Sequence, residues 1–342
     1  MRRHDRNYAQ AQPRGEGMTV TRSRALRVAT AVLLALVLLA GAFLWRNPYA
    51  LISGDFTRQR IAAGLSKASV QIGDDHWVYA YSNDAPRDAP TIVMLHGFTG
   101  SKENWFPVAR LLRERYRVIA PDLPGWGESN RIDGADYGFL AQSERVARFI
   151  RAVSPNGGVV LLGHSMGGGV AALTAARHPG RVARIGLIDA AGVRFADNRF
   201  GIDVLAGKNP FAVYDEASLQ RYLATVFYDD AAKPVIPWPA DRIYIARRTQ
   251  DAAFEQSVLD RIGRGDERFL PGEDAARIRQ PALLLWCRQD AVIDASALAL
   301  YAQRIPQARR VMLEGCGHMS ILEKPEAVAN AVVELIERGR QR

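Results

Sequence analysis

Ser165 stands in the pattern Gly-x-Ser-x-Gly, with Gly163 two residues before it and Gly167 two residues after it. An apolar run over 158–162 precedes the pattern and an alanine-rich stretch over 166–178 follows it, which predicts a strand, a sharp turn and a helix. Such a turn strains the serine backbone, needs small neighbours and exposes the hydroxyl. The alternative is an ordinary glycine-rich turn, but this context favours a nucleophilic serine.

Two more residues with suitable chemistry follow segments that are predicted to form strands. Asp290 comes shortly after the run 282–286, and His318 follows the run 310–314 in a glycine-containing loop. An imidazole can take a proton from a serine hydroxyl, and a carboxylate can hold that imidazole in the required tautomer. The chain order Ser, Asp, His is one of the known orders of such triads. We therefore predict Ser165, Asp290 and His318 as nucleophile, acid and base.

The acid has two other candidates. Asp294 lies about one helical turn beyond Asp290, and Asp189 ends the strand predicted over 185–189. A carboxylate at either place is within plausible reach of His318. The spacing favours Asp290 and leaves the other two open.

Acyl transfer through a serine also needs donors for the oxyanion of the tetrahedral intermediate. The apolar run 91–95 ends in His-Gly-Phe, which places the backbone N–H of Phe98 near the predicted turn. The N–H of Met166 would lie at a helix N-terminus, where partial positive charge favours an anion. We predict these two amides as the oxyanion hole; a loop with two glycines and no catalytic role is the alternative.

Strands alternate with helices along 68–192 and 280–342, which predicts a mostly parallel sheet with helices on both faces. Helical periodicity is also expected over 56–65 and 101–116. Residues 193–279 lack clear strand patterns and are predicted to form an inserted helical cap. The aromatic residues of this segment either pack the cap onto the core or line a pocket for an apolar substrate. They include Phe211, Tyr214, Tyr222, Phe227, Tyr228, Trp238, Tyr244 and Phe254.

The N-terminal region combines a basic tail with an uncharged apolar stretch. Residues 1–27 hold seven arginines against two acidic residues, and residues 28–45 carry no charge. Eighteen helical residues nearly span a bilayer, and the arginines predict that the tail stays in the cytoplasm. A transmembrane signal anchor with a non-cytoplasmic catalytic region is favoured. A cleaved signal peptide, giving a secreted protein, is the alternative. Residues 46–67 are expected to be a linker.

The net charge of +9 resides largely in this tail, so the rest of the chain shows no basic stripe that would favour nucleic acid. Cys287 and Cys316 are too few for a disulfide framework. Free thiols are favoured for them, although both stand beside predicted triad residues and pairing stays open. No His-Glu-x-x-His pattern or other metal-ligand cluster is visible, so no metal is expected.

Across about 68–338 the chain resembles the α/β-hydrolase superfamily, and more narrowly membrane-anchored monoacylglycerol lipases and related bacterial lipases. The resemblance is carried by MLHGFTGSKENW (94–105), APDLPGWGES (120–129), LLGHSMGGGVAAL (161–173), LIDAAG (187–192), LLWCRQDAVID (284–294) and LEGCGHMSILEKPE (313–326). It implies cofactor-independent hydrolysis of carboxylic esters of glycerol or similar alcohols by Ser165, Asp290 and His318. Cys287 departs from the pattern, because relatives often have glycine there.

Two other classes of function stay open at this stage. The same triad serves hydrolases of small esters, amides or C–C bonds, and the cap sequence does not discriminate among them. A non-catalytic scaffold is the least favoured, because all three triad residues and both oxyanion segments are present. Epoxide hydrolases and dehalogenases of this fold are disfavoured, since they use a carboxylate where this chain has Ser165.

Overall fold

The computed structural model describes residues 17–82 and 84–338. The chain divides into two compact units at the Leu51–Ile52 junction. In the first unit, helix α1 (Gly17–Arg46) contains a stretch, Arg24–Arg46, with a mean hydropathy of 2.5. By length and composition this stretch can cross a membrane, and its apolar side chains are exposed. A signal sequence meets the same criteria, so both alternatives for this segment stay open.

The second unit is built on one eight-stranded sheet with the order β1-β2-β4-β3-β5-β6-β7-β8. The first two neighbouring pairs, β1 with β2 and β2 with β4, are antiparallel, and all other pairs are parallel. The prediction of a mostly parallel sheet is therefore confirmed. The strands are β1 Ser66–Ile72, β2 Asp75–Tyr81, β3 Thr91–Leu95, β4 Arg117–Pro121, β5 Val159–His164, β6 Val182–Ile188, β7 Ala282–Cys287 and β8 Arg309–Leu313.

The central strands are apolar on both faces because each face is covered. In β5, Val159 and Leu161 pack into one hydrophobic cluster, whereas Val160 and Leu162 pack into a second cluster on the opposite face. This alternation follows from the two-residue period of a strand, and continuous apolar runs are typical of parallel strands buried between helix layers.

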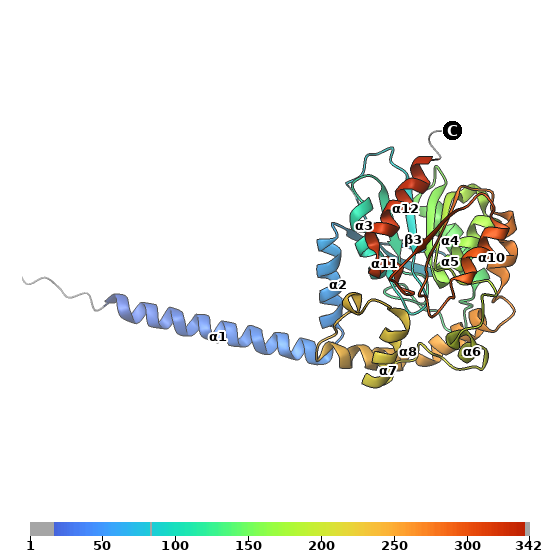
Figure 1. Cartoon of the computed structure of the whole chain (residues 1–342). Coiled ribbons are helices and arrows are strands. Elements are labelled where there is room, and N and C mark those ends of the chain that lie inside the picture. The colour runs from blue at the N-terminus through green and yellow to red at the C-terminus, as the bar shows by residue number, and fades with distance from the viewer. Residues whose placement is uncertain (1–16, 83, 339–342) are drawn as a thin grey trace, which may run out of the picture. The chain divides into compact units, whose positions relative to one another are not determined.

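Two helix layers cover the sheet (Figure 1). Helices α3, α11 and α12 contact one another on one face, and α4, α5, α9 and α10 form the layer on the other. The bounds are α2 Ala50–Ala62, α3 Phe106–Leu112, α4 Phe139–Val153, α5 Met166–Arg177, α6 Arg199–Leu205, α7 Glu216–Val226, α8 Ala240–Gly263, α9 Leu270–Asp274, α10 Ser296–Arg304, α11 Ser320–Glu323 and α12 Pro325–Arg338. Short 3-10 turns occupy Lys102–Trp105, Pro179–Arg181, Asp230–Ala232 and Ala275–Arg277.

The segment 193–279, all of which the structure describes, contains helices α6 to α9 and no strand. Helices α6, α7 and α8 group together at one end of the sheet (Figure 1). Two helices differ from expectation. The helix predicted over 56–65 is α2 and begins earlier, at Ala50, and the one predicted over 101–116 consists of a 3-10 turn followed by the short α3. The division into tail, anchor, linker, core and cap stays a prediction.

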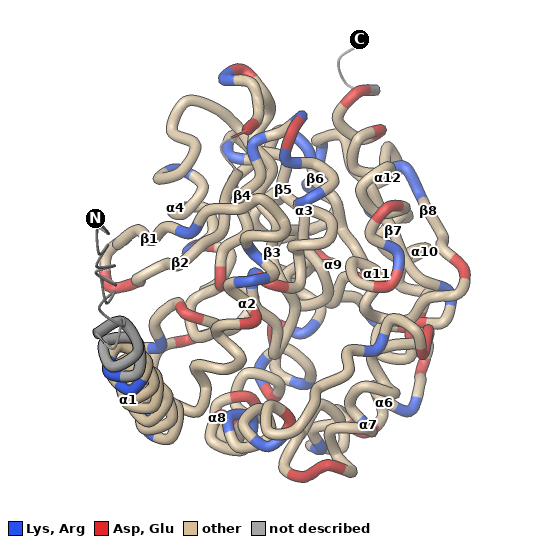
Figure 2. The backbone as a smooth tube through the Cα atoms, turned by 90° about the vertical axis from the view of Figure 1, so that its left-hand side faces the viewer, with Lys and Arg blue, Asp and Glu red and all other residues tan. Residues whose placement is uncertain are grey.

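Charged residues are mixed over the folded unit. Figure 2 shows Lys and Arg interspersed with Asp and Glu along its backbone, without a continuous basic stripe. That nucleic acid is not a partner stays a prediction.

Candidate active site

Ser165 lies in the turn between β5 and α5 with φ +57° and ψ −122°. An L-residue rarely adopts positive φ, so the surrounding structure must hold it there. The Ser165 N–H donates to the carbonyl of Ile188 and its carbonyl accepts from the N–H of Ala191, both at 3.0 Å. A Cβ on Gly163 would lie 2.2 Å from the carbonyl oxygen of Gly167, so this turn requires glycine. The predicted strand–turn–helix context of Ser165 is thus present.

The structure brings Ser165, Asp290 and His318 together. His318 Nε2 lies 2.8 Å from Ser165 Oγ, and His318 Nδ1 lies 2.8 Å from Asp290 Oδ2. The second carboxylate oxygen of Asp290 accepts the N–H groups of Val292 and Ile293 at 2.8 and 2.9 Å. All three triad candidates are buried. The imidazole therefore bridges a hydroxyl and a carboxylate whose own orientation is fixed by backbone donors.

The environment of His318 favours the neutral imidazole. Burial lowers the pKa of His318 to about 3, and the negative charge of Glu323 acts in the opposite direction. Burial also lowers the pKa of His164 to about 3, and its Nε2–H donates to the backbone carbonyl of His318 at 2.7 Å. A neutral imidazole that accepts at Nε2 is the form that can take a proton from Ser165.

The other two acid candidates have different partners. Asp189 Oδ1 accepts the N–H of Cys287 at 2.9 Å, and its Oδ2 accepts the hydroxyl of Ser320. Asp294 Oδ1 accepts the N–H of Ser296 at 2.9 Å. Asp189 thus joins the end of β7 to the Ser320 side chain, and Asp294 accepts from backbone at the start of α10, while Asp290 lies next to the imidazole.

The predicted oxyanion segment packs directly on the nucleophile. A Cβ added to Gly97 would lie 2.9 Å from the Cβ of Ser165, so the loop after β3 approaches the elbow closely. Phe98 and Met166 line the same cavity as Ser165. Their role as oxyanion donors stays a prediction, supported by this shared position.

The cavity beside Ser165 has a volume of about 290 Å³ and reaches from the elbow to α6 and α8. Its lining is largely apolar, with three charged exceptions, Arg194, Asp197 and Arg268. The apolar lining includes Val193, Phe195, Phe200, Val204, Phe211, Leu259, Ile262, Phe269 and Ile293. Such a cavity suits a flexible apolar group.

Both hypotheses for the cap aromatics are partly correct. Of those named from the sequence, Phe211 lines the cavity. Phe254 instead packs against Trp126 and Tyr137, with ring centroids 5.0 and 5.1 Å apart. Trp238 is 79% exposed. Sequence reasoning missed Phe195, Phe200 and Phe269 as lining residues, because periodicity does not tell which face of a short helix or loop meets a cavity.

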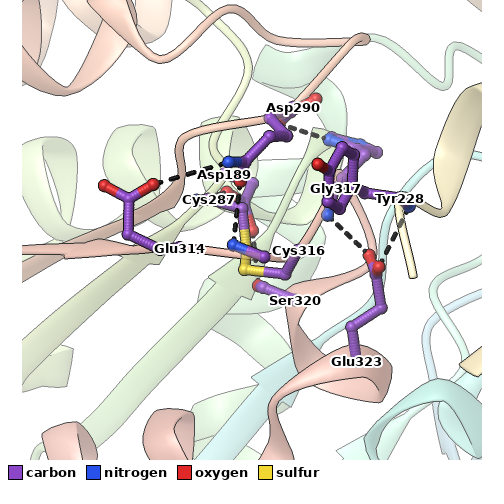
Figure 3. The surroundings of a disulfide bond; sticks show 12 residues. Asp189, Tyr228, Cys287, Asp290, Glu314, Cys316, Gly317, Ser320 and Glu323 are labelled. Atoms are coloured by element: carbon purple, nitrogen blue, oxygen red, sulfur yellow. Dashed lines mark hydrogen bonds and ion pairs between the residues drawn. A yellow bond between two sulfur atoms is a disulfide. The ribbon is translucent and has the colours of Figure 1, made fainter.

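The expectation of free thiols is wrong. Cys287 and Cys316 form a disulfide with a Cα–Cα distance of 5.4 Å across 29 positions of sequence. Figure 3 shows the bond among Asp189, Asp290 and Ser320. The physical reason is the sheet order: β7 and β8 are parallel neighbours, so their carboxyl ends meet. Sequence spacing alone does not reveal that adjacency.

A buried ionic cluster supports the loop that leads away from Phe98. The Lys102 ammonium lies 2.7 Å from Asp122 Oδ2, 2.7 Å from Glu128 and 3.0 Å from Glu103. Asp122 also accepts the backbone N–H of Lys102 at 2.7 Å. Sequence reasoning missed Lys102, although a lysine directly after a predicted active-site loop was a usable signal. Among the described residues, no cluster of His, Cys, Asp and Glu could hold a metal ion.

Residues 90–325 match the family described as alpha/beta hydrolase fold. The chain belongs to this family. Over 310 residues it is 26% identical to monoacylglycerol lipase ABHD6 of Rattus norvegicus, covering 88% of this chain and 90% of the relative. Over 259 residues it is 28% identical to lipase 1 of Psychrobacter immobilis, covering 75% and 79%.

Solved structures of lipid-cleaving enzymes are also similar to this chain. A membrane phospholipase A, described as a bacterial virulence factor, superposes with a TM-score of 0.81 at 34% identity, covering 92% of this chain and 99% of that one. A putative lipase from Acinetobacter baumannii superposes with a TM-score of 0.77 at 27% identity, covering 84% and 96%. The predicted resemblance is confirmed, and the protein is an α/β hydrolase of the lipase or esterase type.

Proposed function

We propose that this protein is a membrane-anchored serine hydrolase that cleaves carboxylic esters of lipids through an acyl-enzyme. The position of His318 supports this most directly. Its imidazole lies 2.8 Å from both Ser165 Oγ and Asp290 Oδ2, beside an apolar cavity that also contains Ser165. A hydroxyl with a neutral base at hydrogen-bond distance is the arrangement that nucleophilic acyl transfer requires.

In the proposed reaction, Ser165 Oγ attacks the ester carbonyl while His318 Nε2 takes the hydroxyl proton. The carbonyl oxygen becomes an oxyanion, which the N–H groups of Phe98 and Met166 stabilise. The C–O bond to the alcohol then breaks, and His318 returns its proton to the departing alcohol. Water, deprotonated by the same imidazole, hydrolyses the acyl-enzyme and releases the carboxylic acid. Asp290 stabilises the imidazolium in both halves.

The cavity supports an apolar acyl group as part of the substrate. Its lining from α6 and α8 is apolar, and its volume of about 290 Å³ is close to the lower limit of small-ligand sites, about 300 Å³. An acyl chain can leave water there, with a gain of about 0.8 kcal/mol per buried methylene. A monoacylglycerol is therefore the first substrate class, and the name of the relative from Rattus norvegicus agrees with it.

A phospholipid acyl ester is the second candidate. Two arginines, Arg194 and Arg268, and one acidic residue, Asp197, line a cavity that is otherwise mostly apolar. Guanidinium groups pair well with phosphate oxygens. The 34% identity to a membrane phospholipase A points the same way.

We place the catalytic unit on the non-cytoplasmic side of a membrane. The arginine-rich residues 1–27 favour a cytoplasmic N-terminus, and a disulfide persists mainly in oxidising compartments. Deleting residues 1–46 is expected to release active enzyme into the soluble fraction. Retention on membranes would mean that the catalytic unit itself contacts lipid. A shortened N-terminus on the purified native protein would instead favour the secreted alternative.

The decisive experiment measures hydrolysis by the full chain in detergent. The substrates are p-nitrophenyl esters from acetate to palmitate, monoacylglycerols and phospholipids, with Ser165→Ala as the blank. We expect medium- or long-chain esters to be preferred and Ser165→Ala to lose activity by about 10⁴-fold or more. Turnover by a folded Ser165→Ala protein would refute the nucleophile. Activity on acetate alone would refute the lipid substrate, and a folded but inactive wild type would move the function to amide or C–C substrates.

A further inference from the structure

The segment that carries His318 has a permissive backbone. It follows β8, the last strand in the order of the sheet, which pairs with β7. Gly315 has φ +69°, and a second glycine, Gly317, directly precedes the histidine. Glycine allows many backbone conformations, so this sequence does not hold the imidazole by itself. Something else must keep His318 at 2.8 Å from both of its partners.

The disulfide lies where such a constraint is needed. Cys287 stands three residues before Asp290, and Cys316 stands two residues before His318 (Figure 3). The bond therefore joins the acid-bearing segment to the base-bearing segment. Both cysteines are fully buried, so the bond is shielded from solvent and from reductants dissolved in it.

A second, non-covalent connection joins the same two segments. Asp189 accepts the N–H of Cys287 through one oxygen and the hydroxyl of Ser320 through the other. Ser320 lies two residues after His318, so the carboxylate and the disulfide hold the base-bearing segment on both sides of the imidazole. Asp189 and Ser320 are fully buried. The imidazole is thus placed by its neighbours in sequence as well as by its own hydrogen bonds.

We propose, resting on the proposed function, that the Cys287–Cys316 disulfide is a positioning element of the Ser165–His318–Asp290 triad. Productive acyl transfer needs the reacting groups within about 0.5 Å of their ideal positions, and loss of the bond lets the two segments drift apart. The enzyme then depends on oxidation. A dithiol reductant that attacks one sulfur breaks the S–S bond, leaves two protein thiols and is itself converted to a disulfide.

The test compares the wild type with Cys287→Ala/Cys316→Ala in the full-length protein, at a temperature where both are folded. We expect kcat on p-nitrophenyl butyrate to fall about 10- to 100-fold with KM changed less than about twofold. Labelling of Ser165 by a fluorophosphonate should slow in parallel. Adding Asp189→Asn should cost more in the double-alanine background than in the wild type, because each connection partly substitutes for the other.

Reduction of the wild type provides the second arm if the alanine variant does not fold. Dithiothreitol is added until thiol titration counts two thiols per chain, kcat is measured, and the protein is reoxidised. Loss of kcat with full recovery supports the proposal. Unchanged kcat in a folded protein with two thiols, or without cysteines, overturns it. A wild type that hydrolyses no ester is a separate result, since it refutes the proposed function before any cysteine is changed.

A different observation carries a second positioning role, for Glu323. One of its carboxylate oxygens accepts the N–H of Gly317 at 2.8 Å, next to His318. The other accepts the N–H groups of Tyr228 and Asp229, at 3.0 and 2.8 Å, just after α7 of the cap (Figure 3). We infer that Glu323 transmits the position of the cap to the catalytic imidazole.

Glu323→Gln tests this role, because an amide offers one acceptor where the carboxylate has two. We expect kcat to fall about tenfold with KM nearly unchanged, since the change acts on His318 and not on the substrate cavity. Glu326→Gln, an exposed position shortly after it, is the matched control and should leave both constants unchanged. Equal kcat in wild type and a folded Glu323→Gln protein, or a rise confined to KM, would overturn the inference.

Discussion

The carboxyl ends of the strands and the cap cavity differ in how tightly their side chains are held. At the strand ends, polar groups have specific partners: Asp290 accepts two backbone N–H groups and the imidazole, and Asp189 joins two neighbouring segments. The cavity wall is mostly apolar and is assembled from short helices and loops. Hydrogen bonds fix direction, whereas apolar contacts mainly fix volume.

This difference separates chemistry from selectivity. Loss of a strand-end group that contacts the imidazole, such as Asp290, removes a partner that no neighbour can replace, so the rate should collapse. A change in the cavity alters how much of the substrate fits, so the preferred substrate should shift while the reaction persists. The same separation explains how one family serves many substrates on one triad.

The largest expected effect on kcat distinguishes the two aspartates that follow β6 and β7. Asp290→Asn should lower kcat about 10⁴-fold, because an amide cannot hold the required imidazole tautomer. Asp189→Asn keeps the size of the side chain and does not touch the imidazole, so kcat should change by less than about tenfold. Steady-state kinetics with p-nitrophenyl butyrate measure both. A near-silent Asp290→Asn together with a collapsed Asp189→Asn would reassign the acid.

Alanine substitutions at two glycines compare how tightly the core and the cap are packed. Ala at Gly167 places a Cβ 2.4 Å from the carbonyl oxygen of His96, and backbone there must move. Gly167→Ala should lower the free energy of unfolding by about 3 kcal/mol. In α6, a Cβ on Gly201 would meet its nearest atom at 3.2 Å, so Gly201→Ala should change stability by less than about 1 kcal/mol. Denaturant unfolding gives both values, and equal losses would contradict the comparison.

Narrowing the cavity should change selectivity more than chemistry. Val204 on α6 is buried and lines the cavity. Val204→Phe removes room for several methylenes, each of which contributes about 0.8 kcal/mol, so kcat/KM for palmitate should fall about 10- to 100-fold. Activity on acetate, which does not fill the cavity, is the internal control. A parallel loss on both esters would show that the cavity does not hold the acyl chain.

The nucleophile turn was predictable from the sequence because its constraint is local. A strained serine between a strand and a helix allows only small residues two positions before and two positions after it. Gly163 and Gly167 occupy these positions. The sheet was predictable for a related reason: continuous apolar runs such as 91–95 and 282–286 are buried on both faces.

The partners of Asp189 and Cys287 could not be predicted, because they depend on which strands become neighbours. Asp189 stood as a rival acid until the sheet order placed it against the Cys287 N–H and the Ser320 hydroxyl. The cavity lining was hidden for another reason. Phe200 and Phe254 are both aromatic residues of the cap segment. Only tertiary packing decides that Phe200 lines the cavity while Phe254 packs against Trp126 and Tyr137.

The smallest expected effect is the change of activity with pH, which again distinguishes the strand ends from the cap. The segment 193–279 contains no histidine, so an imidazole titration in the activity profile must come from outside the cap. The base must be neutral, and burial lowers the pKa of His318 to about 3, so protonation sets in only at lower pH than for a free imidazole. We expect kcat/KM to change less than about twofold between pH 7.5 and 5.5, where an imidazole of ordinary pKa, about 6.5, would lose about tenfold. Thermal unfolding at both pH values controls for loss of structure. A decline centred near pH 6.5 in a fully folded enzyme would show that the Asp290 carboxylate, 2.8 Å from His318 Nδ1, offsets the effect of burial on the imidazole.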